Sequence, residues 1–280
     1  MKILVTGGAG FIGTNLILEL VKAHQVTSID NYIIGSKENH IKNVKYLELD
    51  VLNIDEIDND FDIIYHLAGL SRIQPSFLDY ENTFLNNTMG TLKVLEFAKK
   101  NNSKLIYSGS SSKHHDPYQS PYASSKYLGE ELLISYKRIY DLDYHITRFY
   151  NVYGPYEIKF GEWAAVIGLW RGKIENNESL TIVGDGNQKR DFTHVFDIVD
   201  ALVKIMNYQK KDNFIWELGY GKNYSLNEIY EMFDAKFGCR KTYINQQLGN
   251  YSTTLREDNK ALELLNWIPR LDIKEYISNL

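Results

Sequence analysis

The sequence predicts an α/β fold in which helices cover both faces of a parallel sheet. Short apolar runs recur through the first half of the chain, and segments with helical periodicity separate most of them. Strands that alternate with helices imply a parallel sheet. With 280 residues, 44% of them hydrophobic, the chain can bury a large core. We expect strands at residues 3–5, 26–29, 45–50, 62–67, 104–108 and 145–149.

The first expected strand leads into the glycine-rich turn G7-G-A-G-F-I-G13 and then into a helix over 14–23. Gly7 permits the tight turn, Gly10 lets a pyrophosphate approach the backbone, and Gly13 lets helix and strand pack closely. The helix amino end offers N–H donors to that phosphate. Asp30, at the end of the next strand, can accept the ribose hydroxyls and would repel a 2'-phosphate. These features predict a Rossmann-type site for NAD instead of NADP.

The remaining elements divide the chain into two parts. A long amphipathic stretch over 81–100 and a helix over 121–140 continue the alternation, which becomes irregular after Gly154. We expect a NAD-binding domain over 1–155, to which a segment near 190–205 returns. Residues 156–280 would form most of a smaller α/β substrate-binding lobe.

Composition excludes several classes of protein. The net charge of −5 is spread along the chain, so no basic face is offered to nucleic acid. No apolar run approaches the roughly 18 residues of a membrane span, and no leader pattern precedes Lys2, so we expect a cytoplasmic protein. A single cysteine, Cys239, excludes an internal disulfide and a cysteine metal cluster. The adjacent His114 and His115 lack further ligands at a binding spacing, so no metal is expected.

Several motifs together resemble those of the extended short-chain dehydrogenase/reductase family, and most closely its nucleotide-sugar 4-epimerases. The motifs run from the glycine turn to the carboxyl end of the chain: T6-G-G-A-G-F-I-G13, D30-N31, D50-V51, H66-L-A-G69, N86-N-T-M-G-T91, Tyr122 with Lys126, RFYNVYGP at 148–155, G184-D-G-N-Q-K-R-D-F192 and LLNWIP at 264–269.

The resemblance implies a role for each matched position. The cofactor site would comprise Gly7, Gly10, Phe11, Ile12, Gly13, Asp30, Asn31, Asp50, Val51, Leu67, Ala68, Gly69, Asn87, Tyr122, Lys126 and Tyr150. The substrate would contact Ser110, Asn151, Arg190 and Gln247. His66 would support the fold.

Tyr122 and Lys126 lie four residues apart and therefore share one helix face. A tyrosine needs its pKa lowered by about 3 units, or roughly 4 kcal/mol, to act as a base near neutral pH. One cation at about 4 Å from the phenolate stabilises it by on the order of 4 kcal/mol at an effective dielectric constant of about 20, and oxidised nicotinamide adds a second positive charge. Tyr122 would take the proton of the sugar's 4-hydroxyl while C4 gives hydride to NAD, and Ser110 would donate a hydrogen bond to that oxygen. The catalytic residues are thus expected to be Ser110, Tyr122 and Lys126.

The residues around this set favour epimerisation over other reactions of the family. Ser111 and Ser112 stand where the family's 4,6-dehydratases have an acidic pair and its uronate decarboxylases a glutamate. A nucleotide-sugar reductase or dehydrogenase and a non-catalytic NAD-binding protein are the alternatives. The equivalent helices of the family pair into a dimer, so a homodimer is expected.

The chain departs from the family's pattern at two places that bear on the substrate. The segment between Ser110 and Tyr122 is short, and we expect its Lys113, His114 and His115 to be exposed loop residues, with compensation for the shortened loop as the alternative. Gln247 stands where relatives usually have an arginine that binds the diphosphate, so Arg190 would carry more of that contact. Glu217 and Phe196 also differ from the pattern and are expected to be structural.

Overall fold

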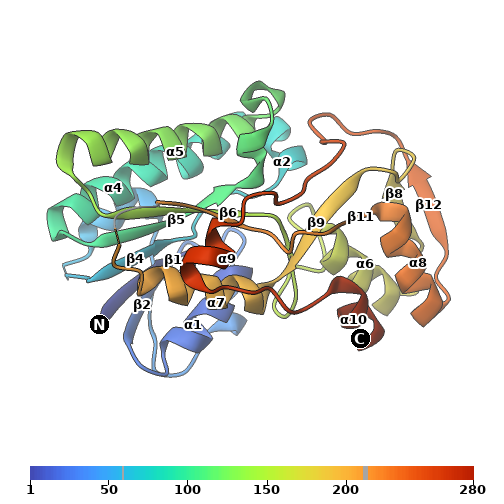
Figure 1. The fold of residues 1–280 in the computed structure, drawn as a ribbon, viewed down its shortest axis with the longest axis horizontal. Helices are drawn as coiled ribbons and strands as arrows, with labels where there is room; N and C mark the ends of the chain where they lie inside the picture. Colours follow the sequence, from blue (N-terminus) through green and yellow to red (C-terminus); the bar gives the residue numbers. More distant parts are fainter. Residues whose placement is uncertain (59, 211–213) are drawn as a thin grey trace.

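The computed structural model describes residues 1–58, 60–210 and 214–280. The larger part of the molecule is built on a seven-stranded sheet in which all neighbouring strands are parallel, in the order β10-β6-β5-β4-β1-β2-β3 (Figure 1). Its strands are β1 (Lys2–Thr6), β2 (Gln25–Asp30), β3 (Lys45–Glu48), β4 (Ile63–His66), β5 (Lys104–Ser110), β6 (Tyr144–Phe149) and β10 (Ile215–Leu218). The predicted α/β fold class is confirmed.

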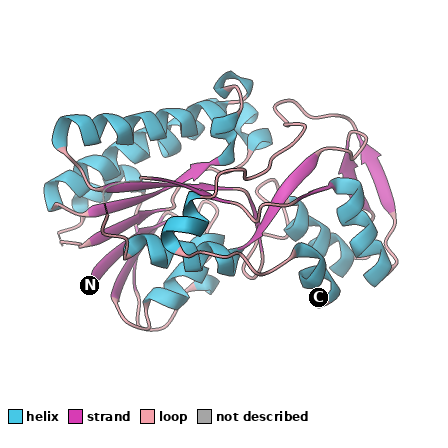
Figure 2. Cartoon of the chain, in the orientation of Figure 1, coloured by secondary structure: helices cyan, strands magenta, loops and turns pink. Residues whose placement is uncertain are grey.

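Both faces of this sheet are covered by helices (Figure 2). Because side chains alternate along a strand, Ile3 and Val5 of β1 pack into one apolar cluster while Leu4 packs into the other. The first face is covered by α1 (Phe11–Leu20), α7 (Val195–Met206) and α9 (Lys260–Leu265), and the second by α4 (Gly90–Asn101) and α5 (Pro121–Tyr140). This two-sided burial explains why the strands read as continuous apolar runs.

Helix α5 has the bounds that the sequence predicts. The Ser120 hydroxyl accepts a hydrogen bond from the Ala123 amide at 3.1 Å, and Pro121 occupies the first turn, where its missing N–H is not needed. Asp141, at φ 53°, ends the helix in the left-handed conformation. Both ends of the helix that carries Tyr122 and Lys126 are therefore fixed locally.

The stretch over 81–100, by contrast, is not one regular helix. It begins in α3 (Tyr80–Phe84), passes through the π-helical turn η3 (Leu85–Met89) and continues as α4. Asn87 lies within the π turn and is buried. Such turns insert one extra residue into a helix and often occur near functional sites.

The smaller part of the molecule has its own sheets and core. Its strands are β7 (Asn151–Tyr153), β9 (Lys189–His194) and β11 (Asn223–Ser225) in one sheet, ordered β11-β9-β7, and β8 (Leu180–Val183) beside β12 (Lys241–Ile244) in a second. Around them pack α6 (Val166–Glu175), α8 (Leu226–Phe237) and α10 (Ile273–Ser278). The other short elements are α2 (Ile73–Leu78), η1 (Lys37–Asn39), η2 (Val51–Glu56), η4 (Ser111–His114) and η5 (Pro117–Gln119).

The chain passes between the two parts more than once. After β7, α6, β8 and β9 in the smaller part, α7 packs beside α1, and β10 then joins the large sheet next to β6. β11 and α8 follow in the smaller part. Among the helices that the structure describes, none combines the length and apolar character needed to cross a membrane.

Candidate active site

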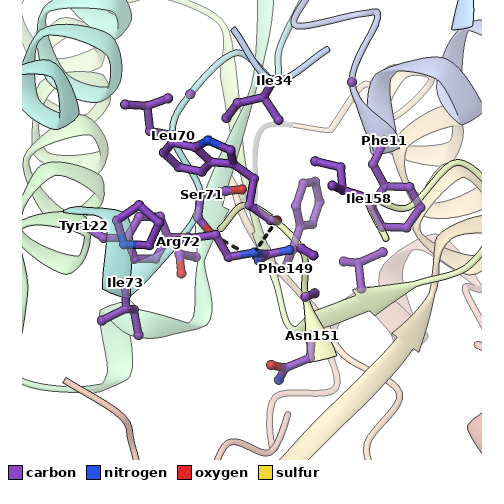
Figure 3. Close-up of a pocket in the computed structure, with 18 of the residues that line it drawn as sticks. Phe11, Ile34, Leu70, Ser71, Arg72, Ile73, Tyr122, Phe149, Asn151 and Ile158 are labelled. Carbon is purple, nitrogen blue, oxygen red and sulfur yellow. Dashed lines mark hydrogen bonds between the residues drawn. The ribbon is translucent and has the colours of Figure 1, made fainter. Parts of the chain in front are cut away.

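A pocket of about 720 Å³ lies at the carboxyl ends of the parallel strands, with walls from both parts of the molecule. This edge of an α/β sheet is where such folds bind ligands. Figure 3 shows side chains from both parts around it, among them Phe11, Tyr122 and Asn151. Of the residues predicted for the site, all except Asp50 and Asn87 line this pocket.

The glycine turn is shaped by close backbone contacts. Gly7 has a φ of 69°, and a Cβ there would lie 2.7 Å from the Ala68 amide nitrogen. A Cβ on Gly13 would lie 2.3 Å from the Gly7 carbonyl oxygen. No side chain caps the amino end of α1 at Gly10, so the first amides of the helix are open to a phosphate. The turn therefore fits the pyrophosphate of a dinucleotide.

Asp30 ends β2 beside this turn. Its carboxylate accepts hydrogen bonds from the Ala9 amide at 3.0 Å and the Tyr32 amide at 2.9 Å, and burial raises the pKa of the carboxyl group. A Cβ on Gly35 would lie 2.9 Å from both carboxylate oxygens, so the following loop wraps closely around Asp30. A carboxylate oriented in this way by backbone donors fits the ribose hydroxyls of NAD.

Asp50 and Asn87 do not line the pocket but hydrogen-bond to residues that do. Asp50 accepts a hydrogen bond from the Asn31 side chain at 2.7 Å and caps η2. The Asn87 side chain binds both the amide and the carbonyl of Leu70, at 2.8 and 3.0 Å, and donates to Ser125. The two residues thus hold wall-lining segments in place.

The predicted catalytic residues meet at one end of the pocket. The Ser110 hydroxyl lies near enough to the Tyr122 phenol to lower its pKa, and both residues line the pocket. Lys126 is buried, donates to the Ser108 carbonyl oxygen at 2.8 Å, and lies with its Nζ 5.0 Å from the centre of the Tyr107 ring. Burial lowers the pKa of the Lys126 ammonium to about 8. The serine, the tyrosine and the lysine therefore come together as expected.

A second cation, Arg72, acts on Tyr122 besides the predicted Lys126. Burial raises the pKa of the phenol, while the Ser110 hydroxyl and the charge of Arg72 lower it in part. The Lys126 ammonium donates to the Ser108 carbonyl oxygen. That Lys126 activates Tyr122 stays a prediction, and the sequence-based account did not include Arg72.

Besides Ser110, the predicted substrate contacts come from the smaller part, where Asn151 begins β7 and Arg190 lies on β9. Asn151 donates to the Asp191 carbonyl and to the Thr254 hydroxyl, both at 3.2 Å. Arg190 is half-buried, and burial lowers the pKa of its guanidinium. Gln247 is also half-buried in the same wall. These three polar groups line the same pocket as the glycine turn.

A buried ion-pair network lies behind Tyr150. The Tyr150 hydroxyl donates to Glu217 at 3.0 Å, and Arg148 connects Glu217, at 2.8 Å, with Glu130, at 2.7 Å. Burial alone would raise the pKa of Glu217, but His114 and Arg148 together hold it below its ordinary value. Glu217, which differs from the family's pattern, is thus one part of a buried ion-pair network.

The shortened loop is more tightly held than expected. Lys113 pairs with Glu131 at 2.8 Å, and His114 lies 3.0 Å from Glu217. The ring of His115 stacks on Tyr251 at 3.8 Å. The expectation of exposed loop residues holds for His114, whereas Lys113 and His115 are half-buried, and each of the three side chains has a partner elsewhere in the fold.

Sequence reasoning missed three residues that line the pocket: Arg72, Glu157 and Trp163. Arg72 donates to the Trp163 carbonyl at 2.9 Å, across 91 positions of sequence. Glu157 pairs with Arg171 at 2.8 Å, and burial raises its pKa to about 7. A positive charge in the loop after an expected strand end, five residues on in L67-A-G-L-S-R72, was the available signal for Arg72. Within the described ranges, no three metal-ligating side chains come together.

An open glycine turn, an acidic residue after β2 and a buried tyrosine–lysine pair in one pocket define an enzyme that works with a nicotinamide dinucleotide. The family model described as "NAD dependent epimerase/dehydratase family" matches residues 3–219. The chain belongs to this family, and NAD is its cofactor.

Similar proteins cover almost the whole chain. A putative UDP-glucose 4-epimerase of Methanocaldococcus jannaschii is 33% identical over 98% of this chain and 95% of its own length. The structure of a Thermotoga maritima UDP-glucose 4-epimerase with UDP-glucose has a TM-score of 0.92 at 28% identity, covering 99% of this chain and 96% of that one. A Bacillus cereus UDP-glucuronic acid 4-epimerase, in complex with UDP-glucuronic acid and NAD, has a TM-score of 0.90 at 28% identity with the same coverage.

Proposed function

We propose that this protein is an NAD-dependent nucleotide-sugar 4-epimerase that acts on a UDP-linked hexose, N-acetylhexosamine or uronate. The observation that carries the proposal is the meeting of Ser110, Tyr122 and Lys126 in the pocket that also contains the glycine turn. Ser111 and Ser112 follow Ser110 in the pocket wall, so neither of these positions supplies the acid that dehydration or decarboxylation would require. The similar proteins named above are described as UDP-sugar 4-epimerases.

The chain's own residues would hold the sugar and move one proton. Bound NAD supplies an acceptor and donor of hydride for C4. Tyr122 takes the 4-hydroxyl proton as C4 is oxidised, and gives it back after the 4-keto sugar has turned to its other face. Ser110 donates a hydrogen bond to the same oxygen. Lys126, fixed by the Ser108 carbonyl, would hold the nicotinamide ribose.

We assign the other pocket residues to the two ligands on their positions. The glycine turn would bind the pyrophosphate of NAD and Asp30 its ribose, while Tyr150 would lie at the nicotinamide. Arg190, Asn151 and Gln247 would bind the substrate's diphosphate. Residues 1–155 would form most of the NAD-binding domain, to which α7 of the later segment near 190–205 and β10 return, and most of 156–280 the substrate lobe.

A homodimer is also proposed, formed through α4 and α5. Large apolar side chains remain exposed on these helices and beside them, including Met89 at 43%, Leu128 at 41%, and Leu78 at 83%. An exposed apolar surface of this kind is typical of an interface. Light scattering that gives the mass of one chain would contradict this proposal. We also propose a cytoplasmic location, since a chain with a single cysteine gains nothing from an oxidising compartment.

The function is tested by incubating the purified protein with catalytic NAD and a panel of UDP-hexoses, UDP-N-acetylhexosamines and UDP-uronates. We expect a 4-epimer without net reduction of NAD, and a loss of roughly 100-fold or more with Tyr122→Phe. Tyr127→Phe is the matched control, because Tyr127 lies on the same helix, contacts Lys113 and does not line the pocket. Turnover that consumes NAD(H) stoichiometrically would favour a reductase, and no product from any sugar would overturn the proposal.

A further inference from the structure

Arg72 brings a positive charge into the pocket from the large sheet. It lies at the end of the loop that follows β4, immediately before α2, and its half-buried side chain lines the pocket. Figure 3 shows the Arg72 side chain extending within the pocket, with dashed hydrogen bonds to two backbone carbonyls. These are the carbonyls of Trp163, at 2.9 Å, and Ser71, at 3.2 Å.

This guanidinium forms no close ion pair with a carboxylate among the residues that the structure describes. Both of its protein acceptors are neutral carbonyls. Glu157 lines the same pocket and its charge acts on Arg72, but the cation that it contacts, at 2.8 Å, is Arg171. A guanidinium presents five donors in a planar fork that matches a carboxylate or a phosphate, so an arginine without a carboxylate in a ligand pocket is suited to bind an anionic ligand.

The position of Arg72 relative to Tyr122 indicates which ligand anion it meets. Both side chains line the pocket, and Figure 3 shows Arg72 and Tyr122 next to each other. The Arg72 charge acts on the Tyr122 phenol, which would take the proton from the 4-hydroxyl. In a nucleotide-linked hexose, the substituent on C5 is the direct neighbour of that hydroxyl, whereas the diphosphate is attached to C1, across the ring. The other arginine of the pocket wall, Arg190, stands on β9 in the smaller part and is available for the diphosphate.

The polar lining near Tyr122 is compatible with a carboxylate at this place. Ser110, Ser111 and Ser112 all line the pocket, and hydroxyl groups can donate to carboxylate oxygens. Burial raises the pKa of Glu157 to about 7, and Arg171 pairs with it at 2.8 Å, so Glu157 repels a second carboxylate weakly.

We infer that Arg72 recognises the carboxylate on C5 of an acidic sugar, so that the preferred substrate is a nucleotide-linked uronate. The inference rests on the proposed function, because it places the 4-hydroxyl at Tyr122. Arg72 acts here as a specificity-determining residue: its guanidinium leaves the Trp163 carbonyl or shares its donors, and forms a charge-assisted contact with the sugar.

Binding measurements separate the carboxylate from the diphosphate. Calorimetry would use the NAD-loaded Tyr122→Phe protein, in which turnover is blocked, with UDP-glucuronate, UDP-glucose and UDP as probes. We expect UDP-glucuronate to bind more tightly than UDP-glucose, and Arg72→Gln to weaken UDP-glucuronate by roughly 30-fold while changing UDP-glucose and UDP by less than about 3-fold. Arg72→Lys should restore part of the loss, since it keeps the charge without the fork.

Arg190→Gln is the matched control, because it removes the other guanidinium of the pocket wall and should weaken all three probes alike. If Arg72→Gln weakens UDP as much as UDP-glucuronate, Arg72 binds the diphosphate and the inference fails. Equal binding of UDP-glucuronate and UDP-glucose by the unsubstituted site also overturns it.

Turnover by the protein with an intact Tyr122 distinguishes this inference from the proposed function. Conversion of UDP-glucuronate to its 4-epimer in preference to UDP-glucose supports both. Epimerisation of neutral UDP-hexoses in preference to UDP-glucuronate overturns the inference and leaves the proposed function standing. Release of CO2 from UDP-glucuronate supports recognition of the acidic sugar and overturns 4-epimerisation as the reaction.

Discussion

Arg148→Met is expected to destabilise the protein strongly, because it removes the guanidinium that joins two buried carboxylates. Glu130 is 1% exposed and Glu217 is 5% exposed, and both accept hydrogen bonds from Arg148 at 2.7–2.8 Å. Breaking a buried ion pair by removing one partner costs about 3–5 kcal/mol. Lys113, 3.9 Å from Glu130, and His114, 3.0 Å from Glu217, still offer partial compensation, so we expect a loss within this range and not twice as large.

The size of the loss should depend on pH. Without Arg148, the two carboxyl groups are buried with weaker partners, so their pKa values in the folded state rise above those in the unfolded state. The folded state then binds more protons, and the variant regains stability as the pH falls toward the raised pKa values. Urea unfolding, followed by circular dichroism, should therefore show a larger loss at pH 8 than at pH 5.5.

A triple variant provides the control for this reasoning. Combining Arg148→Met with Glu130→Gln and Glu217→Gln removes the carboxylates that the single change leaves without a partner, so it should recover part of the stability lost at pH 8. A single-variant loss below about 1 kcal/mol, or an equal loss at pH 8 and pH 5.5, would refute the idea that the network is held by charge compensation.

Three further predictions concern titratable groups near the pocket. Burial lowers the pKa of Lys126 to about 8, which corresponds to a cost of roughly 3 kcal/mol for the charged form. Lys126→Met removes this cost but also loses the hydrogen bond to the Ser108 carbonyl, so the unfolding free energy of the NAD-free protein should rise by about 1–2 kcal/mol at pH 7. Urea titrations should show a smaller rise at pH 10, where the folded-state lysine is already neutral. Asp30→Ala should weaken NAD by roughly 30-fold in calorimetry without creating affinity for NADP. The hydrogen bond to Glu217 raises the pKa of His114, so the stability that this pair gives the folded state is complete below pH 6.5 and is lost as the pH rises through the raised pKa. Since the His114 side chain is 49% exposed, His114→Gln should cost less than about 1 kcal/mol at pH 6 and nothing at pH 9 in thermal melts.

The elements that the sequence predicts well are those whose causes are local. Helix α5 begins with a serine cap and a proline and ends at a left-handed residue, so its bounds follow from its own residues. The glycine turn places its constraints within a few positions of each other, apart from the approach of Ala68 to Gly7. The long amphipathic stretch was interpreted as one helix because a π turn changes the periodicity by only one residue.

The features that sequence reasoning missed depend on contacts between distant positions. The bonds of Arg148 to Glu130 and Glu217 span 18 and 69 positions, and the bond of Arg72 to Trp163 spans 91. His114 is exposed as expected, but its contact with Glu217 could not be predicted because that partner lies 103 positions later. Side-chain pairing of this kind follows from the topology of the sheet, which brings the ends of β5, β6 and β10 together, and not from any local pattern.

These pairings also decide which charges act on the site. The carboxylates of the buried network have Arg148 as their close cationic partner, so they offset the two cations at the tyrosine end of the pocket only in part, Glu130 acting on Lys126. Lys126 and Arg72 donate only to backbone carbonyls in the described structure, and both remain available to charged groups of the ligands. Asp30, at the other end of the glycine turn, is held by amides. The pocket is therefore negative where the ribose of NAD would bind and positive around Tyr122, a polarity that favours the phenolate when the sugar is oxidised.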